Sequence, residues 1–260
     1  MRIELSRRRL LASGAAAGLG GMLLSGCDRL NAAPEFRQFL GSAEGLTKRS
    51  QRFLLSGQPL AREFDRRHIS NVFKPNGSTD PQSPEYLQLV ANDFQDWRLR
   101  VDGLVDRPLS LSLGQLRTLP SRTQITRHDC VEGWSAIGEW KGVPLRVLLQ
   151  SAGLRPEARY IVFHCADNYR NHVGPNERYY ESIDLFDAFH PQTILAYDFN
   201  GGTLPVAYGA PVRLRVERQL GYKQAKYVMR VQVTDSLAGI GMGRGGYWED
   251  HAGYQWYAGI

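Results

Sequence analysis

The chain has 260 residues, 42% of them hydrophobic and 22% charged, which is the composition of a globular protein with one large domain or two small ones. Half of the net charge of +6 belongs to residues 1–26, where four arginines oppose one glutamate. The remaining charge is small, and no basic run with interleaved aromatic residues accompanies it, so the sequence predicts no nucleic-acid partner.

Residues 1–26 have the pattern of an export signal. Ser6-Arg7-Arg8-Arg9-Leu10-Leu11 resembles a twin-arginine signal, and the glycine- and alanine-rich stretch that follows is too short for a membrane span. Leu24-Ser25-Gly26-Cys27 is similar to a bacterial lipobox, which predicts a lipid on Cys27, and Asp28 resembles an inner-membrane retention signal. We therefore expect a periplasmic protein that is lipid-anchored to the inner membrane; an ordinary secretory signal with an incidental cysteine is the alternative. Because the twin-arginine route exports folded proteins, this signal also favours a protein that contains a cofactor.

Residues 27–69 are predicted to form a tether and an N-terminal helical segment, in which the charged run 62–68 is solvated. The following stretch, 71–84, is rich in Pro, Asn, Gly and Ser and is predicted to be a loop. Long loops in ordered domains are often functional. The candidate site residues of this loop are Asn71, Phe73 and Asn76.

From residue 97 onward the sequence predicts short strands mixed with short helices. Apolar residues alternate with polar ones, or run together, in the segments that we predict as strands: 97–101, 160–163, 194–199, 204–206, 212–216 and 227–233. Helices are predicted within 109–119, over 144–152 and after Asp184. Asn200-Gly201-Gly202 is a strong hairpin signal between two of the strands.

This mixture lacks a regular strand–helix–strand rhythm, so the fold class is predicted as α+β with a single main domain over residues 70–235. No glycine-rich nucleotide-binding pattern occurs in the sequence, so a nucleotide cofactor has no support. Residues 236–260 combine glycines with five large aromatic residues. We predict that this C-terminal segment is a lid packed on the domain, and a docking surface for a partner is the alternative.

The stretch 126–140 holds the strongest candidate for chemistry. It contains Cys130, one of three cysteines, with His128 and Glu132 close by and a glycine and a tryptophan directly after. A thiolate among polar residues indicates a metal or nucleophile site, whereas a half-buried cysteine at a strand end is the plain structural alternative. In an oxidising compartment a disulfide with Cys165 is a further possibility.

Cationic residues gather in two later stretches. Arg213 lies in the first, and Lys223 and Lys226 lie on either side of a short polar segment after Gly221. Backbone amides together with lysine and arginine side chains hold phosphate groups in many proteins. A solvated hairpin is the alternative interpretation of two lysines at this spacing.

Four motifs in chain order carry a resemblance to a known family. They are Cys130-Val131-Glu132-Gly133-Trp134-Ser135, Gly142-Val143-Pro144-Leu145, Gly209-Ala210-Pro211-Val212-Arg213, and Gly221-Tyr222-Lys223 with Lys226. Together with Trp97-Arg98-Leu99 before Gly103, they are similar to the molybdenum-cofactor domain of the sulfite oxidase superfamily over residues 70–235. The C-V-E-G-W form resembles the bacterial periplasmic protein-methionine-sulfoxide reductase catalytic subunits more than the sulfite oxidases proper.

The resemblance implies a mixed α/β, sulfite-oxidase-like domain with Mo-molybdopterin as its cofactor. Cys130 would be the catalytic residue and the thiolate ligand of molybdenum. The residues implied to bind the cofactor are Asn71, Cys165, Tyr208, Arg213, Gln224, Ala225 and Lys226. Cys165 and Tyr208 depart from the threonine and the asparagine that the reductases have at these positions, which leaves the substrate open.

The implied function is oxygen-atom transfer, either sulfoxide reduction or sulfite-type oxidation, with electrons exchanged with a separate membrane haem or cytochrome partner. The sequence has no C-x-x-C-H motif, so no covalent c-type haem is expected in this chain. Two alternatives stay open. One is a cofactor-free periplasmic binding lipoprotein with a Cys130–Cys165 disulfide, and the other is a thiol enzyme with Cys130 as nucleophile and His128 as base.

Overall fold

The computed structural model describes residues 45–54, 56–168 and 178–260, and it divides the chain into two compact units, residues 1–55 and 56–260. In the first unit, residues 45–54 are helical. The predicted export signal and the lipobox with Cys27 lie outside the described residues. Among the described helices, none combines the length and the apolar character that crossing a membrane requires.

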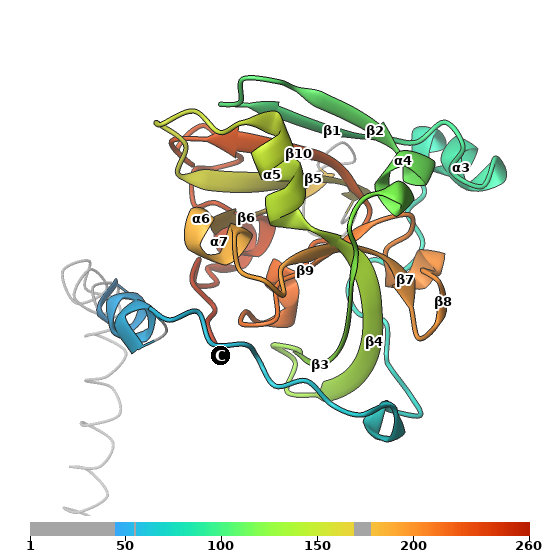
Figure 1. Ribbon diagram of the computed structural model, residues 1–260, viewed down its shortest axis with the longest axis horizontal. Helices are drawn as coiled ribbons and strands as arrows, with labels where there is room; N and C mark the ends of the chain where they lie inside the picture. Colours follow the sequence, from blue (N-terminus) through green and yellow to red (C-terminus); the bar gives the residue numbers. More distant parts are fainter. Residues whose placement is uncertain (1–44, 55, 169–177) are drawn as a thin grey trace, which may run out of the picture. The chain divides into compact units, whose positions relative to one another are not determined.

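The second unit contains two β-sheets (Figure 1). The first sheet has the strand order β2 (Leu109–Ser112), β1 (Arg98–Gly103), β10 (Val228–Thr234), β5 (Tyr160–Asn168) and β6 (Arg178–Asp184). β1 and β10 run parallel, and the other neighbours are antiparallel. The parallel pair places the beginning of the domain beside its end, which local sequence patterns do not show.

The second sheet is antiparallel throughout. Its strands are β3 (Arg122–Asp129), β4 (Ser135–Pro144), β7 (Ile194–Phe199) and β8 (Gly202–Thr203), and β9 (Arg213–Arg215) pairs with β7. β4 and β7 approach so closely that a Cβ on Gly142 would lie 2.1 Å from the Leu195 carbonyl oxygen, so glycine is required there. One mixed and one antiparallel sheet, joined by short helices, confirm the predicted α+β class.

Short helices connect the strands, and capping residues mark where several of them begin. The helices are α3 (Pro84–Ala91), α4 (Leu113–Thr118), α5 (Leu145–Ala152), α6 (Leu185–Ala188) and α7 (Tyr247–Ala252), and the 3₁₀ turns are η1 (Arg66–His68), η2 (Val206–Tyr208) and η3 (Gly221–Lys223). The Ser112 hydroxyl accepts a hydrogen bond from the Gln115 amide at 3.1 Å, and the Asp184 carboxylate accepts one from the Asp187 amide at 3.1 Å. The helices predicted within 109–119, over 144–152 and after Asp184 are therefore confirmed.

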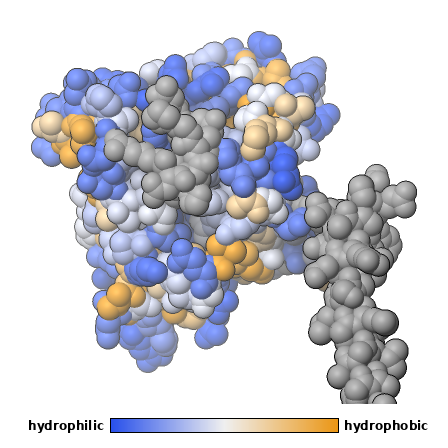
Figure 2. Space-filling view, turned by 180° about the vertical axis from the view of Figure 1, so that it is seen from behind, coloured by the Kyte–Doolittle hydropathy of each residue, from blue (hydrophilic) through white to orange (hydrophobic). Residues whose placement is uncertain are grey.

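Among the described residues, buried side chains form three clusters, and the two larger ones support the sheets. The main core joins the first sheet to α5 and to the inner strands of the second sheet, with Leu99, Leu148, Ile161, Leu214 and Val231 fully buried. The smaller core is aromatic: the Phe73 ring centroid lies 5.5 Å from that of Trp140 and 5.3 Å from that of Phe199. Phe73 thereby attaches the loop before α3 to the second sheet. The face of the molecule in Figure 2 is mostly hydrophilic, and its apolar residues gather in a few separate patches.

The strand around Arg213 differs from the half-buried alternation that its sequence predicts. All three residues of β9 are buried, with Arg213 1% exposed and Arg215 0%. The two guanidinium groups lie 4.8 and 4.5 Å from the centre of the Trp140 ring, and Arg215 forms an interior ion pair with Glu217. An alternating pattern predicts that one face of a strand contacts solvent. On β9, protein covers both faces.

One local prediction needs correction. The return strand of the hairpin after β7 is residues 202–203 and not 204–206, because Asn200 and Gly201 adopt φ values of +49° and +83° and turn the chain at once. The prediction that the charged run 62–68 is solvated is confirmed, because its charged residues are all exposed. Arg66 is 71% exposed even though its guanidinium lies 2.6 Å from the buried carboxylate of Glu139 on β4.

Candidate active site

Cys130 lies at the tip of the hairpin that β3 and β4 form. The last paired residues are Asp129 and Ser135. The chain turns because the Gly133 amide donates to the Cys130 carbonyl oxygen at 3.0 Å, and the Cys130 amide donates to the Trp134 carbonyl oxygen at 2.9 Å. Gly133 has a φ of +84°, which favours glycine. This turn holds the thiol, in a residue that is 7% exposed, at the edge of a cavity.

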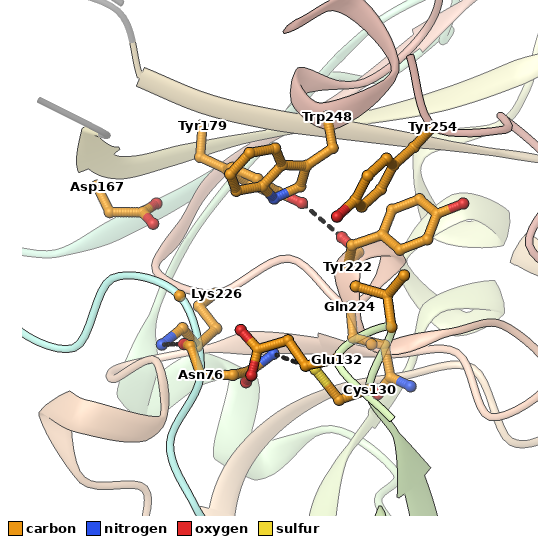
Figure 3. Close-up of a pocket in the computed structure, with 13 residues that line it drawn as sticks. Asn76, Cys130, Glu132, Asp167, Tyr179, Tyr222, Gln224, Lys226, Trp248 and Tyr254 are labelled. Atoms are coloured by element: carbon orange, nitrogen blue, oxygen red, sulfur yellow. Dashed lines mark hydrogen bonds between the residues drawn. The ribbon is translucent and has the colours of Figure 1, made fainter. Parts of the chain in front are cut away.

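This cavity, named here the Cys130 cavity, contains about 680 Å³ of empty space and opens to solvent (Figure 3). Distant segments form its walls: the loop before α3, the β3–β4 turn, the end of β5, the start of β6, η3 with the residues after it, and the C-terminal segment. Its polar side chains are Asn76, Glu132, Asp167, Gln224 and Lys226. Its large rings are Tyr179, Tyr222, Trp248 and Tyr254. A few polar groups set among large rings are typical of the lining of a small-molecule site.

The surroundings of the thiol set its protonation state. Burial raises the pKa of Cys130, and the charge of Glu132 raises it further, whereas hydrogen bonds from the Glu132 backbone and from Asn76 lower it. The Asn76 amide nitrogen lies 3.9 Å from Cys130 Sγ. Because the net shift is upward, a metal ion or another positive charge is needed to favour the thiolate, which is the metal-binding form.

Two buried cations lie at and below the floor of the cavity. Arg213 donates to the Tyr208 carbonyl oxygen at 2.9 Å, and its Nε has no hydrogen-bond partner. Lys226 donates to the carbonyl oxygens of Asn76 at 2.7 Å, Ala207 at 3.2 Å and Ser78. Burial and the neighbouring arginine lower the pKa of Lys226 to about 7, and burial with Arg215 lowers that of Arg213 to about 9.

In the part of the chain that the structure describes, neither Arg213 nor Lys226 forms an ion pair with a carboxylate. A buried charge without an opposite charge is costly. The floor of the cavity is therefore prepared for an anionic group.

The family comparison agrees with this geometry. The family model of the oxidoreductase molybdopterin binding domain matches residues 86–238. The chain belongs to this family. The match includes Cys130, Arg213 and Lys226, and it ends before α7.

Several curated proteins are similar to this molybdopterin-binding domain. The putative protein-methionine-sulfoxide reductase subunit YedZ1 of Azospira oryzae is 45% identical over 64% of this chain and 57% of its own length. The protein-methionine-sulfoxide reductase catalytic subunits MsrP of Gluconobacter oxydans and Ralstonia nicotianae are 34% and 31% identical, over 65% and 88% of this chain and 55% and 69% of theirs. The chain thus spans between about half and two thirds of these relatives. Among solved structures, the sulfane dehydrogenase SoxCD of Paracoccus pantotrophus matches with a TM-score of 0.48 at 28% identity, over 55% of this chain and 39% of its own.

The residues around the cavity fit Mo-molybdopterin, the cofactor of this domain. Cys130 would supply a soft thiolate ligand for molybdenum. The uncompensated charges of Arg213 and Lys226 match the anionic phosphate of the cofactor. Buried Oε1 of Gln224 and Oδ1 of Asp167 have no partner in the protein, and both can accept hydrogen bonds from the N–H groups of a pterin.

The structure brings only some of the predicted cofactor-binding residues to the cavity. Gln224 and Lys226 line it, and Arg213 lies beneath them. Ala225 contributes through its backbone, because its carbonyl oxygen accepts from the Leu214 amide at 2.7 Å and holds the segment against β9.

Three predicted residues lie away from the lining. Cys165 is 2% exposed within the main core, and Tyr208 packs on Phe199 while its hydroxyl donates to the Phe73 carbonyl oxygen at 2.6 Å. Asn71 is exposed. The asparagine of this loop that reaches Cys130 is Asn76, because Phe73 inserts into the aromatic core and directs the following residues toward the cavity.

Lys223 has neither of its predicted roles. It is 1% exposed, and its ammonium lies 2.5 Å from Glu181 and 2.7 Å from Glu249. Two carboxylates occupy the donors that a phosphate would need. The alternative of a solvated hairpin is also wrong, since η3 is buried.

Sequence reasoning missed the Asp167 carboxylate and the rings of Tyr179, Trp248 and Tyr254 as parts of the site. Asp167 follows a run of apolar residues in β5, and a polar residue at the end of an apolar strand was the available signal. Trp248 and Tyr254 belong to the C-terminal segment, which was predicted to be a lid but had no link to Cys130 in the sequence.

The two alternatives to a cofactor protein find no support in the geometry. Cys130 and Cys165 are both free thiols, so the disulfide is not formed. His128 is fully buried, and its Nδ1 lies 3.0 Å from an Arg215 nitrogen. Burial and the neighbouring arginines lower the pKa of His128 well below its usual value, which makes it a poor base for Cys130.

Proposed function

We propose that the complete enzyme reduces sulfoxides by oxygen-atom transfer at a molybdenum centre that Cys130 ligates. The charges around the cavity favour sulfoxide reduction over sulfite oxidation. Among the described lining residues there is no arginine, and the one lysine, Lys226, directs its ammonium at three backbone carbonyl oxygens. Because the charge of Lys226 is balanced by the phosphate of the cofactor, the described lining offers no further cation to an anionic substrate.

Negative charge at the cavity also favours an uncharged substrate. The Glu132 carboxylate accepts from the Trp134 indole at 3.0 Å and lies 3.6 Å from the Lys74 ammonium. The indole hydrogen bond and this lysine lower the pKa of Glu132, so it stays ionised. Sulfite would meet this charge, whereas a neutral sulfoxide would not.

When bound, Mo-molybdopterin supplies two-electron oxygen-atom-transfer chemistry. The residues of the chain bind, orient and shield. Cys130 would bind the metal, Asn76 would orient its sulfur, and Arg213 and Lys226 would balance the charge of the cofactor. The rings of Trp248 and Tyr254 line the side of the cavity next to Tyr222, where they would shield a bound group from part of the solvent (Figure 3).

The proposal also includes where the protein is located and which kind of protein supplies its electrons. The twin-arginine pattern and the lipobox at Cys27 support export and a lipid anchor on the periplasmic side of the inner membrane. Relatives that are named as subunits of protein-methionine-sulfoxide reductases support a sulfoxide substrate and a separate subunit as electron donor, which we propose to be a membrane haem protein.

The test uses holoenzyme purified from cells that make the cofactor. Molybdenum content is measured first, and then reduction of dimethyl sulfoxide with a dye electron donor is compared with oxidation of sulfite. We expect sulfoxide reduction at one molybdenum per chain. Cys130→Ser should lose the metal and more than about 99% of the activity, whereas Cys165→Ala, which changes the core thiol, should keep the metal. Oxidation of sulfite without reduction of any sulfoxide would overturn the proposal.

A further inference from the structure

A second cavity adjoins the Cys130 cavity. It contains about 650 Å³ of empty space, and its walls include Leu220, Tyr257 and Ala258. The C-terminal segment supplies most of this wall, and that segment lies beyond residue 238, where the family match ends. Most of the lining of the second cavity therefore lies outside the part of the chain that the family model matches.

The two cavities have lining residues in common. Val131, Tyr222 and Tyr254 line both of them. The rings of Tyr222 and Tyr254 have centroids 5.0 Å apart, and Trp248 stacks on Tyr254 at 5.8 Å (Figure 3). Val131 is the residue directly after Cys130, and it is 44% exposed. A molecule with its reacting group at Cys130 thus has the second cavity as its neighbour.

The second cavity is apolar and uncharged. Within the described ranges, no side chain with a formal charge lines it, and its one amide side chain is Gln255. Tyrosine rings and aliphatic groups form its surface, and such surfaces favour aryl and alkyl groups over charged ones. This chemistry continues the preference of the Cys130 cavity for an uncharged substrate.

The wall is held in place by hydrogen bonds and does not depend on a ligand. The Tyr222 hydroxyl donates to the Gln255 carbonyl oxygen at 2.6 Å, and the Leu220 amide donates to the Ala258 carbonyl oxygen at 3.0 Å. The Ala258 amide donates to the Gln219 side chain at 2.9 Å. A preformed wall lowers the cost of ordering on binding.

We propose that the second cavity is a substrate subsite, which binds the apolar aryl or alkyl substituent of a sulfoxide whose S–O group occupies the Cys130 cavity. This inference rests on the proposed sulfoxide reduction and adds the substituent as a determinant of specificity. Sulfoxides with one bulky apolar substituent are then better substrates than dimethyl sulfoxide.

The test compares methyl phenyl sulfoxide with dimethyl sulfoxide on the holoenzyme. We expect the ratio of their kcat/KM values to exceed 1 and to fall about tenfold in Tyr257→Ala. The Kd of methyl phenyl sulfoxide for the oxidised holoenzyme, measured by calorimetry without an electron donor, should rise by a similar factor. Leu87→Ala, on the exposed face of α3, is the matched control and should leave the ratio unchanged.

A second pair of variants does not risk the fold, because Gln255 is exposed. Gln255→Lys should improve kcat/KM for a 4-carboxyphenyl methyl sulfoxide about threefold relative to methyl phenyl sulfoxide, and Gln255→Glu should reduce it by a similar factor. Equal responses of both substrates in all three subsite variants would overturn the inference while sulfoxide reduction itself stood. Loss of every sulfoxide activity at full molybdenum content would instead overturn the proposed function.

Discussion

Two buried lysines that lie three residues apart have opposite surroundings. Lys223 meets two carboxylates, Glu181 and Glu249, and their charges outweigh the effect of burial and raise its pKa. Lys226 meets only backbone carbonyl oxygens at hydrogen-bond distance, and burial lowers its pKa to about 7. The first lysine is a structural cross-link that completes its own charge balance. The second is left for an anionic group that the protein does not provide.

The same contrast separates two regions of the molecule. Through Glu249 on α7 and Glu181 on β6, Lys223 fastens the C-terminal segment to the first sheet, which keeps Trp248 and Tyr254 over the cavity. Lys226 belongs to the floor on the other side of the same cavity. The region around Lys223 holds the wall of the cavity in place, and the region around Lys226 belongs to the proposed cofactor site.

Replacing Lys223 should have the largest effect on folding. Lys223→Met leaves two buried carboxylates facing each other, and loss of one partner of a buried ion pair costs about 3–5 kcal/mol in the free energy of unfolding. Urea denaturation of the variant and of Lys141→Met, an exposed control, measures this difference. A loss below about 1 kcal/mol, which is the size expected of a surface substitution, would show that the ion pairs of Lys223 with Glu181 and Glu249 do not fasten the C-terminal segment.

Replacing Lys226 should separate cofactor binding from folding. Lys226→Met leaves three carbonyl oxygens without a donor but also removes a buried charge, so the cofactor-free protein should lose only about 1–2 kcal/mol. The molybdenum content of the purified variant should fall severalfold, whereas Lys141→Met should retain it. Full molybdenum in Lys226→Met would contradict the role of this lysine as part of the cofactor floor.

Measured per pH unit, the smallest expected effect is a dependence of stability on pH. Between about 7, the pKa of Lys226 in the folded protein, and its usual value of 10.5, the unfolded chain holds a proton that the folded chain has lost. The free energy of unfolding of the cofactor-free protein should therefore rise with pH across this window, by about 1 kcal/mol per pH unit. Below pH 7 both states are protonated, and the cost of the buried charge is fully present.

Denaturation curves at pH 7, 8 and 9 for the native sequence and for Lys226→Met measure this contribution. The slope of the free energy of unfolding against pH should be smaller in Lys226→Met, by about 1 kcal/mol per pH unit. Identical slopes would mean that the lysine stays charged inside the folded protein, with Asp167, which opposes the downward shift, as its effective partner.

Local sequence patterns predicted much of the framework. The capping residues Ser112 and Asp184, the glycine-rich turn after β7 and the apolar strand of β5 act through neighbours within a few residues, so they were readable before any contact was known. The predictions failed where a distant segment covers a polar face, as on β9, where both arginines are interior.

Within the site, the sequence by itself determined the centre. The motif around Cys130 and the later cationic stretch with Arg213 and Lys226 predicted the cofactor through their resemblance to the sulfite oxidase superfamily. Which asparagine of the loop reaches the thiol was decided by the tertiary structure, since Phe73 anchors the loop and Asn76 follows from that contact.

The roles of the two lysines and of the C-terminal rings were also decided by the tertiary structure. Lys223 differs from Lys226 only in what strands and helices from elsewhere bring to it, and Trp248 meets Cys130 only across the assembled cavity. Residue chemistry is a property of the sequence, but charge balance and enclosure depend on contacts between distant segments, and these form only when the chain folds.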